Sequence, residues 1–240
     1  MEETYNFEAI ILNRYAFRES DSRVILYSRE RGKLELVARG TKKIKSKIAP
    51  HIEPFNLVEA MAVKGKSFDY LGSAISRSAF YNIKNDLSLL AVAGRIIKFL
   101  NQSVKEAEPD QQIFLLTKEA LKILNDKKLK NEKEELVELF YIYKLMVTLG
   151  YKPDLFNCLH CHKKISDQKN YFDITRGGII CPNCLKNSLN YKRLTISSNL
   201  IKILRFANKN ALSELMKLKI NEILKEELDN FIRSFQQYHK

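Results

Sequence analysis

The chain has 240 residues, of which 45% are hydrophobic and 29% are charged, a composition typical of a globular protein with a substantial core. Its net charge of +13 favours a polyanionic partner, because each neutralised phosphate releases counterions. No stretch approaches the roughly 18 apolar residues that a membrane span needs, and residues 1–8 lack the apolar core of a signal peptide. The sequence therefore predicts a cytoplasmic protein with no membrane partner.

Five strand-like stretches occupy the first eighty residues, at positions 7–15, 23–27, 33–38, 55–63 and 68–75. Leu34, Leu36 and Ala38 alternate with their neighbours at the period of two that is typical of a strand. A turn at Gly65 separates the last two stretches. Five short strands favour a small OB-type barrel, although the pattern alone also fits an SH3-like barrel.

Helices are predicted from residue 83 onward, where the apolar period changes from two to about 3.6. Asn85 and Asp86 are suitable caps for the first helix, and Pro109 and Asp110 open the second. A third helix runs from about Glu132 to a stop at Gly150. Further helices are predicted at residues 199–208, 212–218 and 221–238. We expect an α+β protein in which these helices form one bundle and the cysteine-containing segment is an insertion.

All four cysteines fall in two C-x-x-C pairs, Cys158 with Cys161 and Cys181 with Cys184, and 19 residues separate the pairs. Two residues between ligands allow both thiolates of a turn to point at one tetrahedral ion. In a reducing compartment such pairs favour metal binding over disulfides. A glycine pair at 177–178 predicts a hairpin that folds residues 171–175 back against 179–180. The spacing predicts one structural Zn²⁺ per chain with all four cysteines as ligands.

His160 and His162 flank the first pair as alternative ligands. Four thiolates already complete the coordination shell, so both histidines are expected on the surface. A catalytic zinc site keeps an open position, and zinc deaminases carry an H-x-E motif beside their C-x-x-C pair. Neither His160 nor His162 begins such a motif. We therefore expect the metal to hold structure and to take no part in chemistry.

A basic run at residues 39–47 contains no acid and five cations, namely Arg39, Lys42, Lys43, Lys45 and Lys47. Residues 14–47 together carry 11 basic and 4 acidic groups, and residues 163–193 form a second basic segment. A basic loop beside a barrel is suited to binding the phosphate backbone of a nucleic acid without recognition of its base sequence. The alternative is a solvated lysine-rich loop of unrelated function.

Four aromatic residues of the strand region are candidates for stacking against nucleobases, namely Tyr15, Phe17, Tyr27 and Phe55. Such residues more often fill the core of a barrel, and we expect a core position for most of them.

The sequence predicts no enzymatic activity. Gly65, Lys66 and Ser67 have the spacing that ends a phosphate-binding loop, but the full motif needs a glycine where this chain has Ala60. The K-x-D-G motif of nucleotidyl-lysine ligases fails at Leu87. Carboxylates are scattered, without the cluster that two-metal phosphoryl chemistry requires.

Three blocks of residues stand at spacings typical of one protein family. The first spans the early strands, at residues 9–14, 19–24, 32, 37–43, 45–46 and 54–55. The second is Leu-Gly-Tyr-Lys-Pro-Asp at 149–154, and the third is the glycine pair at 177–178 that leads into the second cysteine pair. Together they resemble the RecO family of bacterial recombination mediators across nearly the whole chain.

That resemblance implies an OB-fold DNA-binding domain at 1–82, a helical domain at 83–157 and 194–240, and a zinc module at 158–193. It implies binding of single- and double-stranded DNA, annealing of complementary strands, and a nucleoid-associated location. It also implies work with RecR to replace single-strand-binding protein by RecA, with docking onto the acidic C-terminal tail of the single-strand-binding protein. The family's basic surface corresponds here to Arg14, Arg39, Lys42, Lys43, Lys45 and Lys47.

One alternative is a zinc-containing regulator or adaptor that binds RNA or protein through the same basic surface. A sequence-specific regulator should carry a reading helix, and none of the predicted helices is strongly basic along one face. A DNA-processing enzyme is a further alternative, but the sequence contains no catalytic constellation.

Overall fold

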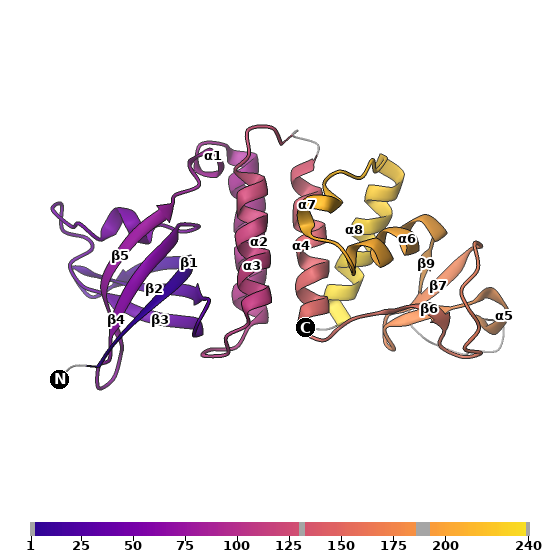
Figure 1. The fold of residues 1–240 in the computed structure, drawn as a ribbon, viewed down its shortest axis with the longest axis horizontal. Coiled ribbons are helices and arrows are strands. Elements are labelled where there is room, and N and C mark those ends of the chain that lie inside the picture. The colour runs from indigo at the N-terminus through magenta and orange to yellow at the C-terminus, as the bar shows by residue number, and fades with distance from the viewer. Residues whose placement is uncertain (1–2, 130–132, 186–192, 239–240) are drawn as a thin grey trace. The chain divides into compact units, whose positions relative to one another are not determined.

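The computed structural model describes residues 3–129, 133–185 and 193–238. The chain forms two compact units, Met1–Glu134 and Glu135–Lys240, each with its own sheet and helices (Figure 1). The mixed α+β fold predicted from the sequence is confirmed. Within the described ranges, no helix is both long and apolar enough to cross a membrane. The domain boundaries expected after residues 82, 157 and 193 stay a prediction.

The first unit contains five strands that close into a barrel in the order β1-β2-β3-β5-β4. Their bounds are β1 (Thr4–Phe17), β2 (Asp21–Ser28), β3 (Gly32–Ala38), β4 (Leu57–Val63) and β5 (Tyr70–Ser78). Neighbouring strands run antiparallel except β3 and β5, which pair in parallel at Val37 and Tyr70. The five predicted strands are thus confirmed, and they form one closed barrel (Figure 1).

The barrel encloses side chains from alternate positions of its strands. Leu36 and Ala38 are buried there and Leu34 packs against them, as the period of two predicts. Tyr27 and Phe55 are also buried, so these two aromatic residues belong to the interior of the unit. Burial of each large apolar side chain contributes about 1.5–3 kcal/mol.

Helices of the first unit lie beside the barrel. They are η1 (Ala49–Ile52), α1 (Tyr81–Lys84), α2 (Leu87–Ser103) and α3 (Gln111–Leu124). Asp86 and Asp110 are confirmed as N-caps, and each carboxylate accepts hydrogen bonds from two backbone N–H groups of the first turn. The Tyr27 hydroxyl accepts a hydrogen bond from the Asp110 backbone N–H at 3.1 Å, which ties α3 to strand β2.

The second unit combines a four-stranded sheet with helices. The sheet has the order β6-β8-β7-β9, with β6 (Asp154–Cys158), β7 (Asn170–Asp173), β8 (Gly178–Ile180) and β9 (Arg193–Ile196). The helices are α4 (Glu134–Thr148), α5 (Pro182–Leu185), α6 (Ser198–Ala207), α7 (Leu212–Leu215) and α8 (Glu222–Tyr238). The start predicted for α4 at Glu132 lies outside the described residues.

The predicted hairpin is confirmed, because Tyr171 pairs with Ile180 and Phe172 with Ile179. Phe172 also packs against α8, with its ring centroid 4.8 Å from that of Phe231. Strands β6 and β9 and helix α5 were not predicted. Elements of four or five residues contain too few positions for a period to appear.

Candidate nucleic-acid interface and metal centre

A groove of about 770 Å³ opens on the barrel between two segments that are distant in sequence. One wall is the loop that follows β3, and the other comprises the β4–β5 turn and the start of β5. Six basic residues and no acidic residue line this groove, namely Arg39, Lys43, Lys45, Lys47, Lys64 and Lys66. We call it the basic groove.

Four of the six residues predicted to contact DNA line the basic groove. The other two, Arg14 and Lys42, fasten the loop. The Lys42 ammonium donates to the backbone carbonyl of Arg18 at 2.9 Å, and the Lys42 backbone N–H donates to that of Ser20 at 3.0 Å. These bonds attach the loop to the β1–β2 turn.

Arg14 lies mostly inside the protein, with 19% of its side chain exposed. Its guanidinium donates to Ser22 Oγ at 3.3 Å and to the backbone carbonyls of Ala49 and Thr41, both at 3.2 Å. It also forms an ion pair with Glu53. Strand β1 is thereby joined to both ends of the basic loop.

Sequence reasoning missed Lys64 and Lys66, which lie in the β4–β5 turn. No local sequence signal marks them, because it is the parallel pairing of β3 and β5 that brings the residues after Val37 beside the turn before Tyr70. The Arg39 guanidinium carbon lies 4.0 Å from the centroid of the Tyr70 ring, so a cation–π contact connects the two walls.

The β4–β5 turn is tight at Gly65. A Cβ atom at this position would lie 2.1 Å from the backbone oxygen of Phe68, closer than any side chain permits. The Gly65 N–H donates to Asp69 Oδ1 at 3.2 Å, and the Asp69 carboxylate also accepts from the Tyr5 hydroxyl at 2.6 Å. The glycine therefore sets the path on which Lys64 and Lys66 are presented.

Positive charge in the groove is poorly compensated. Lys43, Lys45, Lys47 and Lys66 have exposed side chains, and none of them forms an ion pair with any residue that the structure describes. Lys64 pairs with the exposed Glu3 at 2.8 Å, an interaction that salt and competing anions readily screen. The groove can therefore attract and hold a chain of phosphates.

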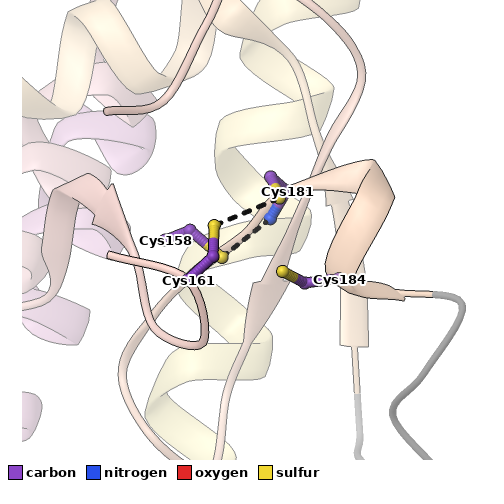
Figure 2. Close-up of side chains that lie close together, drawn as sticks. All are labelled: Cys158, Cys161, Cys181 and Cys184. Carbon is purple, nitrogen blue, oxygen red and sulfur yellow. Dashed lines mark hydrogen bonds between the residues drawn. The ribbon is translucent and has the colours of Figure 1, made fainter. Parts of the chain in front are cut away.

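The four cysteines converge on one point between β6 and the start of α5 (Figure 2). Their sulfur atoms all lie within 4.8 Å of one another, and the sulfurs of Cys161 and Cys181 are 3.8 Å apart. In a tetrahedral site with Zn–S distances of about 2.3 Å, the sulfurs are about 3.8 Å apart. The donor set therefore fits one tetrahedral metal ion.

Strand pairing brings the two cysteine pairs together. Cys158, at the end of β6, is the register partner of Ile179 in β8, and β8 leads directly to Cys181. The Cys181 backbone N–H donates to the sulfur of Cys158 at 3.4 Å. The hairpin predicted from the sequence thus delivers the second pair to the first.

The four thiols differ in how readily they lose a proton. Burial acts to raise the pKa of Cys158, but backbone N–H groups of Cys161, Cys181 and His160 favour the thiolate and lower its pKa to about 6. The neighbouring thiols of Cys181 and Cys161 raise the pKa of Cys184 to about 12. Because four adjacent thiolates repel one another, a divalent cation is needed to hold all of them deprotonated.

The histidines lie outside this cluster. His160 and His162 are exposed, and the group of residues able to hold a metal comprises cysteines alone within the described chain. An H-x-E spacing does occur at His51 and Glu53, in the other unit. There His51 Nδ1 accepts from the Ser76 backbone N–H at 3.2 Å, so this histidine holds local structure.

The sequence was compared with known families and with curated proteins. Residues 1–80 match the family model "Recombination protein O N terminal", and residues 84–240 match "Recombination protein O C terminal". A "DNA repair protein RecO" from Desulforamulus reducens is 32% identical over 236 residues, which cover 98% of this chain and 89% of that protein. Another, from Dehalococcoides mccartyi, is 30% identical over 230 residues, covering 96% of this chain and 88% of that protein.

Proposed function

This chain belongs to the recombination protein O (RecO) family of DNA repair and recombination proteins, and we propose that its basic groove holds the sugar–phosphate backbone of DNA. The observation that carries this proposal is that six cations from two segments line the groove and no acidic residue lines it. Contacts to phosphate fix the position of a strand without reading its sequence. The groove therefore suits both single- and double-stranded DNA.

Annealing of complementary strands is the activity that this charge distribution favours. Two polyanions must approach against their mutual repulsion, so a second cationic surface is useful. In the metal-binding unit, Lys163, Lys164 and Lys169 are exposed. Lys186 and Lys192, which belong to the same predicted basic segment, lie outside the described residues.

We propose Zn²⁺ as the metal and a structural role for it. Four thiolates complete the shell of zinc and leave no open position for substrate or water. The site joins β6 to the β7–β8 hairpin, whose Phe172 contacts Phe231 of α8. Zinc would thus stabilise the core of the second unit.

We further propose that the protein works with RecR to replace single-strand-binding protein by RecA, and that it does so without enzymatic turnover. Family membership supports these partners. The acidic C-terminal tail of the single-strand-binding protein is the expected docking element, since a short acidic segment complements a basic chain. Purified protein should neither hydrolyse nucleotide nor cut DNA.

A strand-annealing assay with coated DNA tests the proposal. Complementary strands are covered with full-length or tail-deleted single-strand-binding protein, and annealing is followed with and without this protein. We expect this protein to anneal naked strands, and to anneal coated strands only when the coating protein retains its tail. Equal annealing of both kinds of coated strand would show a generic basic annealer and contradict the mediator role.

A further inference from the structure

A cluster of aromatic rings and guanidinium groups is formed by the end of β1, the β1–β2 turn, strand β2 and the β4–β5 turn. It comprises Tyr15, Phe17, Phe68, Arg18 and Arg23, and we call it the aromatic platform. The rings of Phe17 and Phe68 meet edge to face with their centroids 6.0 Å apart. The guanidinium carbon of Arg23 lies 4.5 Å from the centroid of Phe17 and 5.0 Å from that of Phe68.

Tyr15, Arg18 and Phe68 of the platform are exposed, and Phe17 and Arg23 are half-buried. Tyr15 and Phe68 each retain 39% of their surface in contact with solvent. These residues stand outside the barrel core, which is filled by other side chains. A group of aromatic faces left in water indicates a binding surface more often than a packing defect.

Hydrogen bonds hold the platform in place before any ligand arrives. Glu35 accepts from Arg23 at 2.6 Å and from the Tyr15 hydroxyl at 3.0 Å, which fixes both side chains. A preorganised surface loses little rotamer entropy on binding.

The platform and the basic groove are continuous along the chain. Phe68 is two residues from Lys66, which lines the groove, and it precedes Tyr70, whose ring contacts Arg39. Lys42, which belongs to the loop of the other wall but does not line the groove, donates a hydrogen bond to the backbone carbonyl of Arg18, the residue after Phe17. A strand whose phosphates lie in the groove therefore has its bases within reach of the platform.

We propose that the aromatic platform stacks unpaired nucleobases of a single strand whose backbone lies in the basic groove. The inference rests on the proposed DNA-binding function and adds to it a means of preferring single strands. Every base has a π-face, so stacking on aromatic rings is sequence-tolerant. Paired bases already stack on one another in a duplex, which leaves the platform no base to take up.

The test uses three probes with the full chain: an oligothymidine, an abasic strand of the same length, and a duplex. The variants are Phe68→Ala, Phe68→Leu, which keeps an apolar side chain but removes the ring, and Ile75→Ala as the control. Ile75 is an exposed apolar residue of β5 in the same barrel, with 60% of its surface in solvent. Urea denaturation verifies that each variant is folded. If Phe68→Ala does not fold, Phe68→Leu replaces it in the binding measurements.

We expect Phe68→Ala to weaken oligothymidine binding by about tenfold, at the lower end of the range for loss of one aromatic stacking partner. Binding of the abasic strand and of the duplex should stay unchanged, as should the salt dependence, because no phosphate contact is lost. Ile75→Ala should behave as the unmodified protein does.

Two results would overturn the inference. Unchanged affinity for all three probes would show that no base stacks on Phe68, and an equal loss for oligothymidine and the abasic strand would place the effect on the backbone path. Failure of the proposed DNA-binding function would give a different result. The unmodified protein would then not bind the abasic strand, or would bind it with an affinity that does not depend on salt concentration.

Discussion

The guanidinium of Arg14 donates a hydrogen bond to the backbone carbonyl of Thr41 at 3.2 Å. Thr41 is buried in the first part of the basic loop, and its hydroxyl is 2.7 Å from that of Ser22. The same guanidinium binds Ala49 beyond the far end of the loop. Arg14, predicted as a phosphate contact, thus lies where it fixes the shape of the segment that carries the lysines.

Replacement of Arg14 by Met should lower the free energy of unfolding by about 1–3 kcal/mol, because partners inside the barrel unit lose their hydrogen bonds. DNA affinity should fall for every sequence, while the dependence of log affinity on log salt keeps its slope. Urea denaturation and binding at several salt concentrations measure both quantities. Arg77→Met is the control, since Arg77 pairs with Glu59 on the surface. A slope that becomes shallower by about 0.7 would instead identify Arg14 as a phosphate contact.

Charge removal in the groove should change that slope. If about five phosphates are neutralised, log affinity for single strands should fall with log salt at a slope of about −3.5. The triple change of Lys43, Lys45 and Lys47 to Ala should make this slope shallower by about 2, because three counterion-releasing contacts are lost.

The control for the groove variant is the triple change of Lys98, Lys105 and Lys122 to Ala. These lysines are exposed in the helical part of the same unit, so the net charge changes equally. Its slope should stay close to that of the unmodified protein. Equal effects of the two triple variants would mean that DNA responds to total charge and has no fixed place in the groove.

Metal analysis of the purified protein should give one equivalent of zinc per chain. Cys181→Ser should lose it, whereas His160→Ala and His162→Ala should retain it, because the histidines stand outside the sulfur cluster. Chelation should lower the thermal stability of the second unit, whose sheet is joined through the site. Metal affinity should fall as pH falls, since protons compete for the thiolates. A stable, metal-free protein prepared under reducing conditions would contradict the structural site.

Replacement of Gly65 by Ala should distort the β4–β5 turn. The added methyl group would meet the Phe68 backbone oxygen at 2.1 Å, which forces the chain that carries Lys64 and Lys66 to move. We expect weaker binding of both single- and double-stranded DNA in a filter-binding or fluorescence-anisotropy assay. Gly94→Ala in α2 is the matched control, because nothing lies within 4 Å of its added methyl group. That substitution should stabilise the helix by about 0.5–1 kcal/mol and leave DNA binding unchanged; normal DNA binding by the Gly65 variant would show that the turn is dispensable.

Local patterns were sufficient for much of the molecule. The alternation at Leu34, Leu36 and Ala38 predicted a strand, and Asp86 and Asp110 predicted helix starts, because each signal depends on neighbours within a few residues. The C-x-x-C spacing predicted the four-cysteine cluster for the same reason, because two thiols in one turn can supply two corners of a tetrahedral site.

The sequence by itself determined the types of the longer helices and strands, the pairing of the four cysteines that meet in one cluster, and the basic loop, because each of these is encoded over a short stretch. Only the tertiary structure decided which cations share a surface, because closure of the barrel through β3 and β5 brings Lys64 and Lys66 to the loop. It also separated the four candidate aromatic residues: Tyr27 and Phe55 are buried, Tyr15 is exposed and Phe17 is half-buried, so only two of the four have the expected core position. Residues of one chemical type look alike in the local sequence, because their different roles depend on contacts with parts of the chain that are distant in sequence.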